Sequence, residues 1–196
     1  MRDVTPGSLS IPKEIFSHLK KFAVHPMEEI RHLPDWNWPR VFTMQIALSI
    51  ISGLLSAVVR TEFSTWKILQ AVILFPLIST FTGLILASFF YYYFQVFEKR
   101  TVSFIKLSTV VFLSTTVFYL FHSIAGLFAF FDILGMLFTG FLLVMGLTEN
   151  FQMQKKNSIR LVGVLLALIF SVWIFEKIHE ARMNTSASSA PFDSTL

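Results

Sequence analysis

The sequence predicts an all-α fold: a polytopic transmembrane helical bundle of five spans, preceded by an interfacial amphipathic helix. Composition is the first indication, because the 196-residue chain is 54% hydrophobic and only 14% charged, whereas a soluble domain carries about 25% charged residues. The second is the run from Leu107 to Leu147, in which only His122 and Asp132 can carry charge. One span needs about 20 residues, and this run is about twice as long. Basic clusters flank it on both sides, so it predicts a helical hairpin that enters and leaves the membrane on one face.

The first 40 residues are expected to lie outside the hydrocarbon. Residues 1–9 are expected to be a disordered lead-in, and residues 10–40 a cytosolic segment of amphipathic helices and a linker. From Ile11 to Leu33 apolar residues recur at helical spacing, which predicts a basic amphipathic helix. Pro26 restarts it, because proline is tolerated in a first turn. Such a helix beside a span typically lies in the lipid interface. The alternative is a small cytosolic cap packed on the protein's own loops.

Five apolar runs then form a transmembrane domain over 41–175, with spans at about 41–59, 68–97, 102–121, 126–147 and 160–175. The second run would stretch about 45 Å as a helix, so it must tilt, kink or protrude. Pro76 supplies a kink site within it. The third and fourth runs are the hairpin. Residues 176–196 are expected to form a disordered outer tail.

The distribution of lysine and arginine predicts how the chain is oriented. With the N-terminus inside, 12 of the 16 Lys and Arg residues fall in inner segments and 4 in outer ones. By the positive-inside rule the N-terminus is therefore cytosolic and the C-terminus lies on the opposite side. The expected location is the plasma or inner membrane of a bacterium, or the Golgi or endoplasmic reticulum of a eukaryote.

Small residues and aromatic rings predict how the spans are held. Helices in lipid associate where small residues let their backbones approach, and four-residue spacing puts such residues on one face. The predicted packing residues form three trios: Ser49, Gly53 and Ala57; Ser79, Gly83 and Ala87; Gly163, Ala167 and Ser171. Amphipathic rings suit the headgroup level, and the predicted interface anchors are Trp36, Trp38, Tyr91, Tyr92 and Tyr93.

Asp132 is the one carboxylate within an apolar run, and a charge near the bilayer centre costs at least about 2.5 kcal/mol. If the chain reverses at 123–126, Asp132 lies one to two turns inside the outer face. There it could meet water, the positive end of its helix or His122. Together with Lys106, which can snorkel to headgroups from the inner end of the third span, these are the candidate intramembrane polar residues. A structural or interfacial role for Asp132 is favoured, with proton or ion handling as the alternative.

Known chemical motifs are missing from the sequence. There is no cysteine, which excludes disulfides, thiolate metal sites and cysteine nucleophiles. There is no His-Glu-x-x-His, Gly-x-Ser-x-Gly or Walker motif. We therefore expect no enzyme activity, no catalytic, metal-binding or cofactor-binding residue, and no cofactor. The net charge of +4 suits basic loops beside anionic headgroups rather than nucleic acid. The expected partners are membrane lipids and a protein in the membrane or on its cytosolic face, and a homo-oligomer remains open.

Three segments carry a resemblance to a known family. A Pro-led helix over 25–30 precedes the first span, a polar junction over 98–108 opens the third, and a Gly-Leu end with a basic lead into the fifth span lies at 143–160. In this layout, roughly over residues 24–175, the chain resembles the Yip1-domain family of five-span membrane proteins in its shorter, bacterial-type form. The Asp-Leu-x-Gly-Pro element of many eukaryotic members is absent, and no binding residue is carried over.

The resemblance implies a non-enzymatic protein of membrane organisation or trafficking, an adaptor that binds lipids or partner proteins through its inner helix and basic loops. The alternative is a small transporter or channel component that uses Asp132 and His122. An enzyme acting on lipid is a third hypothesis.

Overall fold

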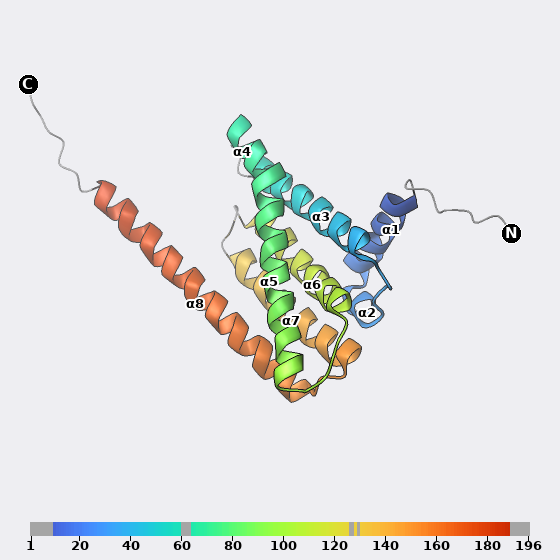
Figure 1. The fold of residues 1–196 in the computed structure, drawn as a ribbon. Coiled ribbons are helices and arrows are strands. Elements are labelled where there is room, and N and C mark those ends of the chain that lie inside the picture. The colour runs from blue at the N-terminus through green and yellow to red at the C-terminus, as the bar shows by residue number, and fades with distance from the viewer. Residues whose placement is uncertain (1–9, 60–63, 126–127, 129, 189–196) are drawn as a thin grey trace, which may run out of the picture.

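The described part of the chain is helical throughout, with short connections. The computed structural model describes residues 10–59, 64–125, 128 and 130–188. Its elements are, in order, α1 (Ser10–Val24), α2 (Pro26–Arg31), α3 (Trp38–Val59), α4 (Thr65–Leu69), the π-helical turn η1 (Gln70–Leu74), α5 (Phe75–Val96), α6 (Phe104–Ile124), α7 (Phe130–Phe151) and α8 (Lys155–Ser188) (Figure 1). Within these described residues, five segments are long and apolar enough to cross a membrane: α3, the continuous run α4–η1–α5, α6, α7 and α8 as far as Phe175. The predicted all-α, five-span fold, with short helices before the first span, is confirmed.

α6 lies at the centre of the bundle. It packs against α3, α5 and α7, and 56% of its apolar window is buried within the protein, against 11% for the window in α8. Ser103 caps its first turn by accepting a hydrogen bond from the Lys106 N–H at 3.5 Å. The side chains at the core of the bundle include Phe90, Phe94, Val110, Val111, Phe112, Leu113 and Leu147. The hairpin of α6 and α7 is therefore the element around which the other spans are arranged.

The second span contains a π-helical turn immediately before its proline. A proline ring collides with the carbonyl four residues earlier and removes one backbone donor. Here the Phe75 N–H bonds to the Gln70 carbonyl, five residues back, so the backbone is widened by one residue just ahead of Pro76. Such a turn absorbs the misfit that proline imposes. The sequence predicts a kink site at Pro76, and the π-helical turn begins at Gln70, more than one helical turn before it.

α8 is a single helix of 34 residues, which corrects the disordered tail predicted from residue 176. The stretch from Glu176 to Ser188 has no glycine or proline, and its Glu, Lys, Ala and Arg residues have high helix propensity. Hydropathy marks the end of the apolar segment but not the end of the helix. Figure 1 shows α8 leaving the rest of the bundle at an angle. Residues 1–9 and 189–196, for which disorder is predicted, lie outside the described residues.

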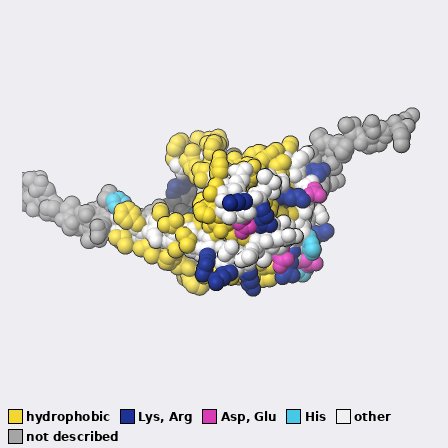
Figure 2. Space-filling model, turned by 60° about the horizontal axis from the view of Figure 1, so that its bottom comes forward, with side chains coloured by type: hydrophobic (Ala, Val, Ile, Leu, Met, Phe, Trp, Pro, Cys, Tyr) yellow, Lys and Arg dark blue, Asp and Glu magenta, His cyan; other side chains and the backbone are white. Residues whose placement is uncertain are grey.

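Lysine and arginine gather at one end of the bundle. We call it the basic end: α3, α6 and α8 begin there, and α5 and α7 end there. Figure 2 looks toward this end and shows dark blue side chains on it, with apolar side chains beside them. The basic residues at this end are Arg31, Arg40, Lys99, Arg100, Lys106, Lys155, Lys156 and Arg160. The opposite end, where α6 reverses into α7, is called the reversal end.

α1 and α2 pack against the bundle at the basic end as a cap. Ile15 and Phe22 of α1 and Ile30 of α2 are buried and belong to the main core. Ile30 lies over α7 beside Gly146, and its carbonyl accepts a hydrogen bond from Asn150 Nδ2 at 2.7 Å. One apolar face of α1 is thus buried against the protein itself, as the cap alternative predicts.

The opposite face of α1 is exposed. Phe16 is 72% and Val24 64% exposed, and Lys20 and Lys21 beside them are exposed as well. His18 connects α1 to α2 within the cap, because its Nδ1 lies 3.0 Å from a carboxylate oxygen of Glu29 in α2. α1 therefore docks one apolar face on the bundle and exposes two large apolar side chains, Phe16 and Val24, among lysines on the other.

Two helices end at residues with left-handed backbone that are not glycine. Lys99 after α5 has φ 50°, and Gln152 after α7 has φ 51°. In both, the next N–H bonds back to a helical carbonyl six residues earlier in the chain, one residue further back than in a Schellman motif: Arg100 to Phe94 at 3.1 Å and Met153 to Leu147 at 3.4 Å. The two loops of the basic end are thus built alike.

Glycine at either of these positions is expected to stabilise the protein. Gln152→Gly or Lys99→Gly should raise the free energy of unfolding by about 0.5–1 kcal/mol, because glycine adopts left-handed backbone without steric cost. The control Gln95→Gly, in the last turn of α5, should lower it by about 1 kcal/mol. Unfolding in detergent followed by circular dichroism measures all three. Equal losses at positions 152 and 95 would contradict the left-handed backbone.

Candidate functional site

His122 and Asp132 meet at the reversal end. His122 is in the last turn of α6 and Asp132 in the first turn of α7, and His122 Nδ1 lies 2.8 Å from Asp132 Oδ1. The imidazole also stacks on the Phe118 ring, with centroids 5.6 Å apart. A carboxylate in a first turn is stabilised by the unpaired N–H groups of the helix. The structure thus brings together the two polar residues that the sequence singles out, and their contact connects α6 to α7 at the reversal end.

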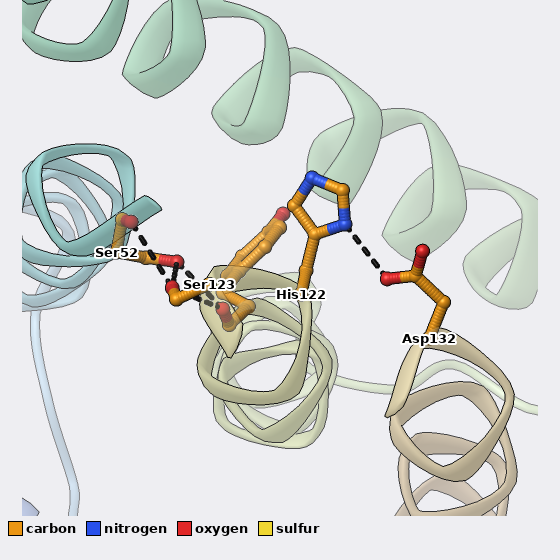
Figure 3. A network of polar contacts seen from close by, with 5 residues as sticks. Ser52, His122, Ser123 and Asp132 are labelled. Atoms are coloured by element: carbon orange, nitrogen blue, oxygen red, sulfur yellow. Dashed lines mark hydrogen bonds and ion pairs between the residues drawn. The ribbon is translucent and has the colours of Figure 1, made fainter. Parts of the chain in front are cut away.

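A second polar cluster lies beside this pair and joins α3 to α6. Ser52 Oγ lies 2.6 Å from Ser123 Oγ and donates to the Tyr119 carbonyl at 2.6 Å. Figure 3 shows the two serines facing each other, while the His122 ring points away from them toward Asp132. Both serines are buried. Hydroxyls in an apolar interior are stable only when hydrogen-bonded, so this cluster fixes α3 against α6.

A third cluster joins α3 to α5 deeper in the bundle. Ser49 Oγ and Ser79 Oγ are 2.7 Å apart, and Gln45 Nε2 lies 3.3 Å from Ser49 Oγ. Gln45 is wholly buried, and its Oε1 has no hydrogen-bond partner among the described residues. The interior of the helical bundle therefore contains an amide whose acceptor is unused.

Sequence reasoning missed most of these polar contacts. Of Gln45, Ser49, Ser52, Tyr119 and Ser123, it selected Ser49 alone, as a packing residue. A signal was present in the spacing of Gln45, Ser49 and Ser52, since positions i, i+4 and i+7 share one helix face. A polar stripe on an apolar helix indicates a buried contact with another helix.

Lys106 does not join the intramembrane polar residues. Its Nζ lies 3.0 Å from Asp35 Oδ1, an exposed carboxylate in the linker before α3. Lys106 therefore belongs to the basic end, where its ion pair connects the start of α6 with the linker that leads from the cap. The sequence prediction of a snorkelling lysine missed this partner.

Two of the three small-residue trios lie where helices approach each other. A Cβ on Gly53 would come within 2.8 Å of the Ala71 carbonyl oxygen, and one on Gly83 within 2.3 Å of the Phe112 ring. Ala87 is fully buried, and Ala57 is half-buried. The Ser49–Ser79 contact links these two trios directly.

The third trio differs from the prediction. Gly163, Ala167 and Ser171 are all exposed, and a Cβ on Gly163 would meet nothing within 4 Å. α8 instead turns Leu166 toward α7, against Gly140. Spacing shows which face of a helix could approach another helix, but no helix of the described chain packs closely on this face of α8.

The predicted interface anchors divide in a similar way. Trp36 is 7% exposed, and its ring packs edge-on against His18, with centroids 4.9 Å apart. Trp36 therefore lies inside the cap and does not face headgroups. Trp38 is half-buried and stacks on Phe42. Tyr91 and Tyr93 are half-buried, and Tyr92 is exposed. For these four residues the anchoring role remains a prediction.

The polar side chains at these sites are engaged mainly in hydrogen bonds with one another. Across the described ranges, no group of three or more His, Cys, Asp or Glu side chains could hold a metal ion. A serine nucleophile needs a base within hydrogen-bond reach, but the Ser123 hydroxyl bonds to Ser52 and Tyr119, whereas His122 bonds to Asp132. The imidazole–carboxylate contact joins α6 to α7, and the hydroxyl clusters join α3 to α6 and to α5.

Comparison with known proteins gives one match. A family model described as Yip1 domain matches residues 20–175, which is most of the chain and includes every candidate span. A search of curated proteins and a search of solved structures each found no match.

Proposed function

Because the chain belongs to the Yip1-domain family of membrane proteins, we propose that it is a non-enzymatic membrane organiser, an adaptor that engages lipids or a partner protein at its basic end. The observation that carries this proposal is the open second face of α1. A helix that served only to complete the core would need one apolar face, whereas α1 also exposes Phe16 and Val24 on its other side.

The composition of that open face favours a membrane surface as its first contact. Phe16, Lys20 and Val24 follow one another at four-residue spacing, so they share one side of the helix. Large apolar side chains interspersed with lysines are typical of helices that lie at the headgroup level. Each lysine near an anionic surface adds about 1 kcal/mol of attraction. Membrane contact through this face would present the basic loops to lipid or to a partner.

A labelled cap tests this proposal directly. The chain has no cysteine, so Ser17→Cys, on the exposed side of α1, carries a single polarity-sensitive dye. In vesicles that contain phosphatidylglycerol we expect dye emission typical of an apolar surrounding, and the double variant Phe16→Ser, Val24→Ser should return it to that of water. Emission typical of water in the unaltered cap would refute the interfacial contact. Deletion of residues 10–33 is less sharp, because it also removes the buried Ile30.

We propose that the basic end faces the cytosol, with the N-terminus inside and the C-terminus on the other side. The excess of lysine and arginine at that end supports this orientation. Reporter tags at the two termini should fall on opposite sides of the membrane, whereas tags in one compartment would contradict an odd number of crossings.

A small transporter or channel component is the second candidate function, and the His122–Asp132 contact at 2.8 Å favours it. Under the leading proposal, Asp132→Asn leaves the cap's binding to vesicles unchanged, and protein in liposomes moves no more protons than empty liposomes do. A pH-sensitive dye trapped in the liposomes measures the flux. A flux that Asp132→Asn abolishes would replace the adaptor by the transporter.

A further inference from the structure

α5 and α8 are neighbours whose backbones do not approach each other closely. α8 packs on α7, and the described residues of α5 make no close backbone approach to it. Figure 1 shows the two helices converging at the basic end and separating toward the reversal end. The space between these two membrane-spanning helices is lined by side chains of both and of α6 and α7.

An apolar cavity of about 330 Å³ lies in this gap, between α5, α6, α7 and α8. Leu86 of α5 and Leu165 and Ile169 of α8 form its two side walls, and Tyr119 of α6 and Leu143 of α7 lie among the residues behind them. Every one of these residues belongs to a candidate membrane span. The cavity is therefore suited to a hydrocarbon chain, because apolar walls gain nothing from water.

A polar depression lies between the same helices at the basic end. It is lined by Glu98 and Arg100 after α5, by Gln152 and Gln154 after α7, and by Asn157 in the first turn of α8. Its residues offer amide groups, the Arg100 guanidinium and the Glu98 carboxylate that pairs with it. The space between α5 and α8 is thus polar at the basic end and apolar further along the helices.

The spacing of the two sites suits one lipid molecule. At 1.5 Å per residue, Leu165 lies about 12 Å along α8 from Asn157. Half of the hydrocarbon layer is about 15 Å thick, which is the depth that one acyl chain reaches. A headgroup in the depression would therefore bring its own chain to the cavity.

The charge around the depression selects the kind of headgroup. Lys99, Lys155, Lys156 and Arg160 are exposed and lie within three residues of its lining residues in the sequence, and none forms an ion pair with any described carboxylate. Arg100 is already engaged, since it pairs with Glu98 and donates to the Phe151 carbonyl. Four unpaired cations around one depression favour a ligand with negative charge.

From this arrangement we infer that the gap between α5 and α8 binds one anionic phospholipid of the leaflet at the basic end. Its phosphate lies at the polar depression near the unpaired cations, and an acyl chain fills the cavity between Leu86 and Leu165. The inference deepens the lipid-binding part of the proposed function and rests on it only in that the protein engages lipid at the basic end. It concerns helices that the α1 experiments leave unaltered, so the two can fail separately.

Native mass spectrometry of the delipidated full-length protein tests the inference. Phosphatidylglycerol and phosphatidylcholine with identical chains are titrated into the detergent solution, and bound lipid is counted. We expect one phosphatidylglycerol to bind several-fold more tightly than phosphatidylcholine. Lys155→Gln and Lys156→Gln should each weaken phosphatidylglycerol about fivefold and leave phosphatidylcholine unchanged.

Neighbouring residues supply matched controls for the cavity. Leu165→Trp fills the cavity and should weaken both lipids about tenfold, whereas Val164→Trp, on the exposed side of the same helix turn, should weaken neither. Leu86→Trp and Ile85→Trp repeat the comparison on the opposite wall, should Leu165→Trp fail to fold. The inference is overturned if the protein retains no lipid, if both lipids bind equally, if both members of a pair act alike, or if glycerol 3-phosphate binds as well as the whole lipid.

Discussion

Valine in place of Gly53 is expected to separate α3 from the second span and to lower the free energy of unfolding by about 2–3 kcal/mol. A Cβ at this position would lie 2.8 Å from the Ala71 carbonyl oxygen and 3.2 Å from its Cα. Both atoms belong to the backbone, so no side-chain rotation relieves the overlap and the helices must move apart. The movement would also stretch the Ser49–Ser79 contact of 2.7 Å, which leaves hydroxyls unpaired in an apolar interior.

Gly163→Val is the matched control for this change. It adds the same atoms to a membrane-spanning helix at a site where a Cβ meets nothing within 4 Å, so stability should change by less than about 0.5 kcal/mol. Unfolding of both variants in detergent, by added denaturing surfactant, gives the comparison. Similar losses at the two sites would show that α3 and the π-helical turn are not in close contact.

Alanine in place of Ile30 is expected to loosen the cap and to cost about 3 kcal/mol. Ile30 is fully buried and lies against Gly146 and Val110, where truncation leaves a cavity at the joint between cap and bundle. Trypsin cleavage after Lys20 or Lys21 requires the cap to open, so its rate follows the population of the open form. A loss of about 3 kcal/mol should therefore raise the cleavage rate about a hundredfold. Met27→Ala, at a 47% exposed position of the same helix, should change neither stability nor cleavage appreciably. Unaltered cleavage in Ile30→Ala would mean that α1 is held by other contacts.

The number of spans and the hairpin could be predicted from the sequence because both depend on local quantities. Length and hydropathy decide whether a segment can cross a membrane, and neither requires knowledge of what lies beside it. The run from Leu107 to Leu147 therefore identified α6 and α7 before any contact was known. The family resemblance, based on three short segments, is confirmed by the match over residues 20–175.

Apart from the end of α8, which hydropathy does not mark, the errors concern partners, which periodicity does not identify. Spacing showed that α1 has an apolar face but not that Ile15 and Phe22 bury it on the bundle. Likewise it showed that Gly163, Ala167 and Ser171 share a face, yet that face is exposed. Asp132 could be placed near His122 because the reversal between them is short.

The length of α8 also has a consequence for anything joined to the far end of this helix. Its apolar part ends at Phe175, and 21 residues of helix span about 31 Å, close to the thickness of the hydrocarbon. The helix then continues to Ser188, a further 20 Å or so at the same rise per residue. That extension is a stalk, and a fluorophore on it would stand at a set height above the lipid. Any change in the inclination of α8 would become a measurable change in that height.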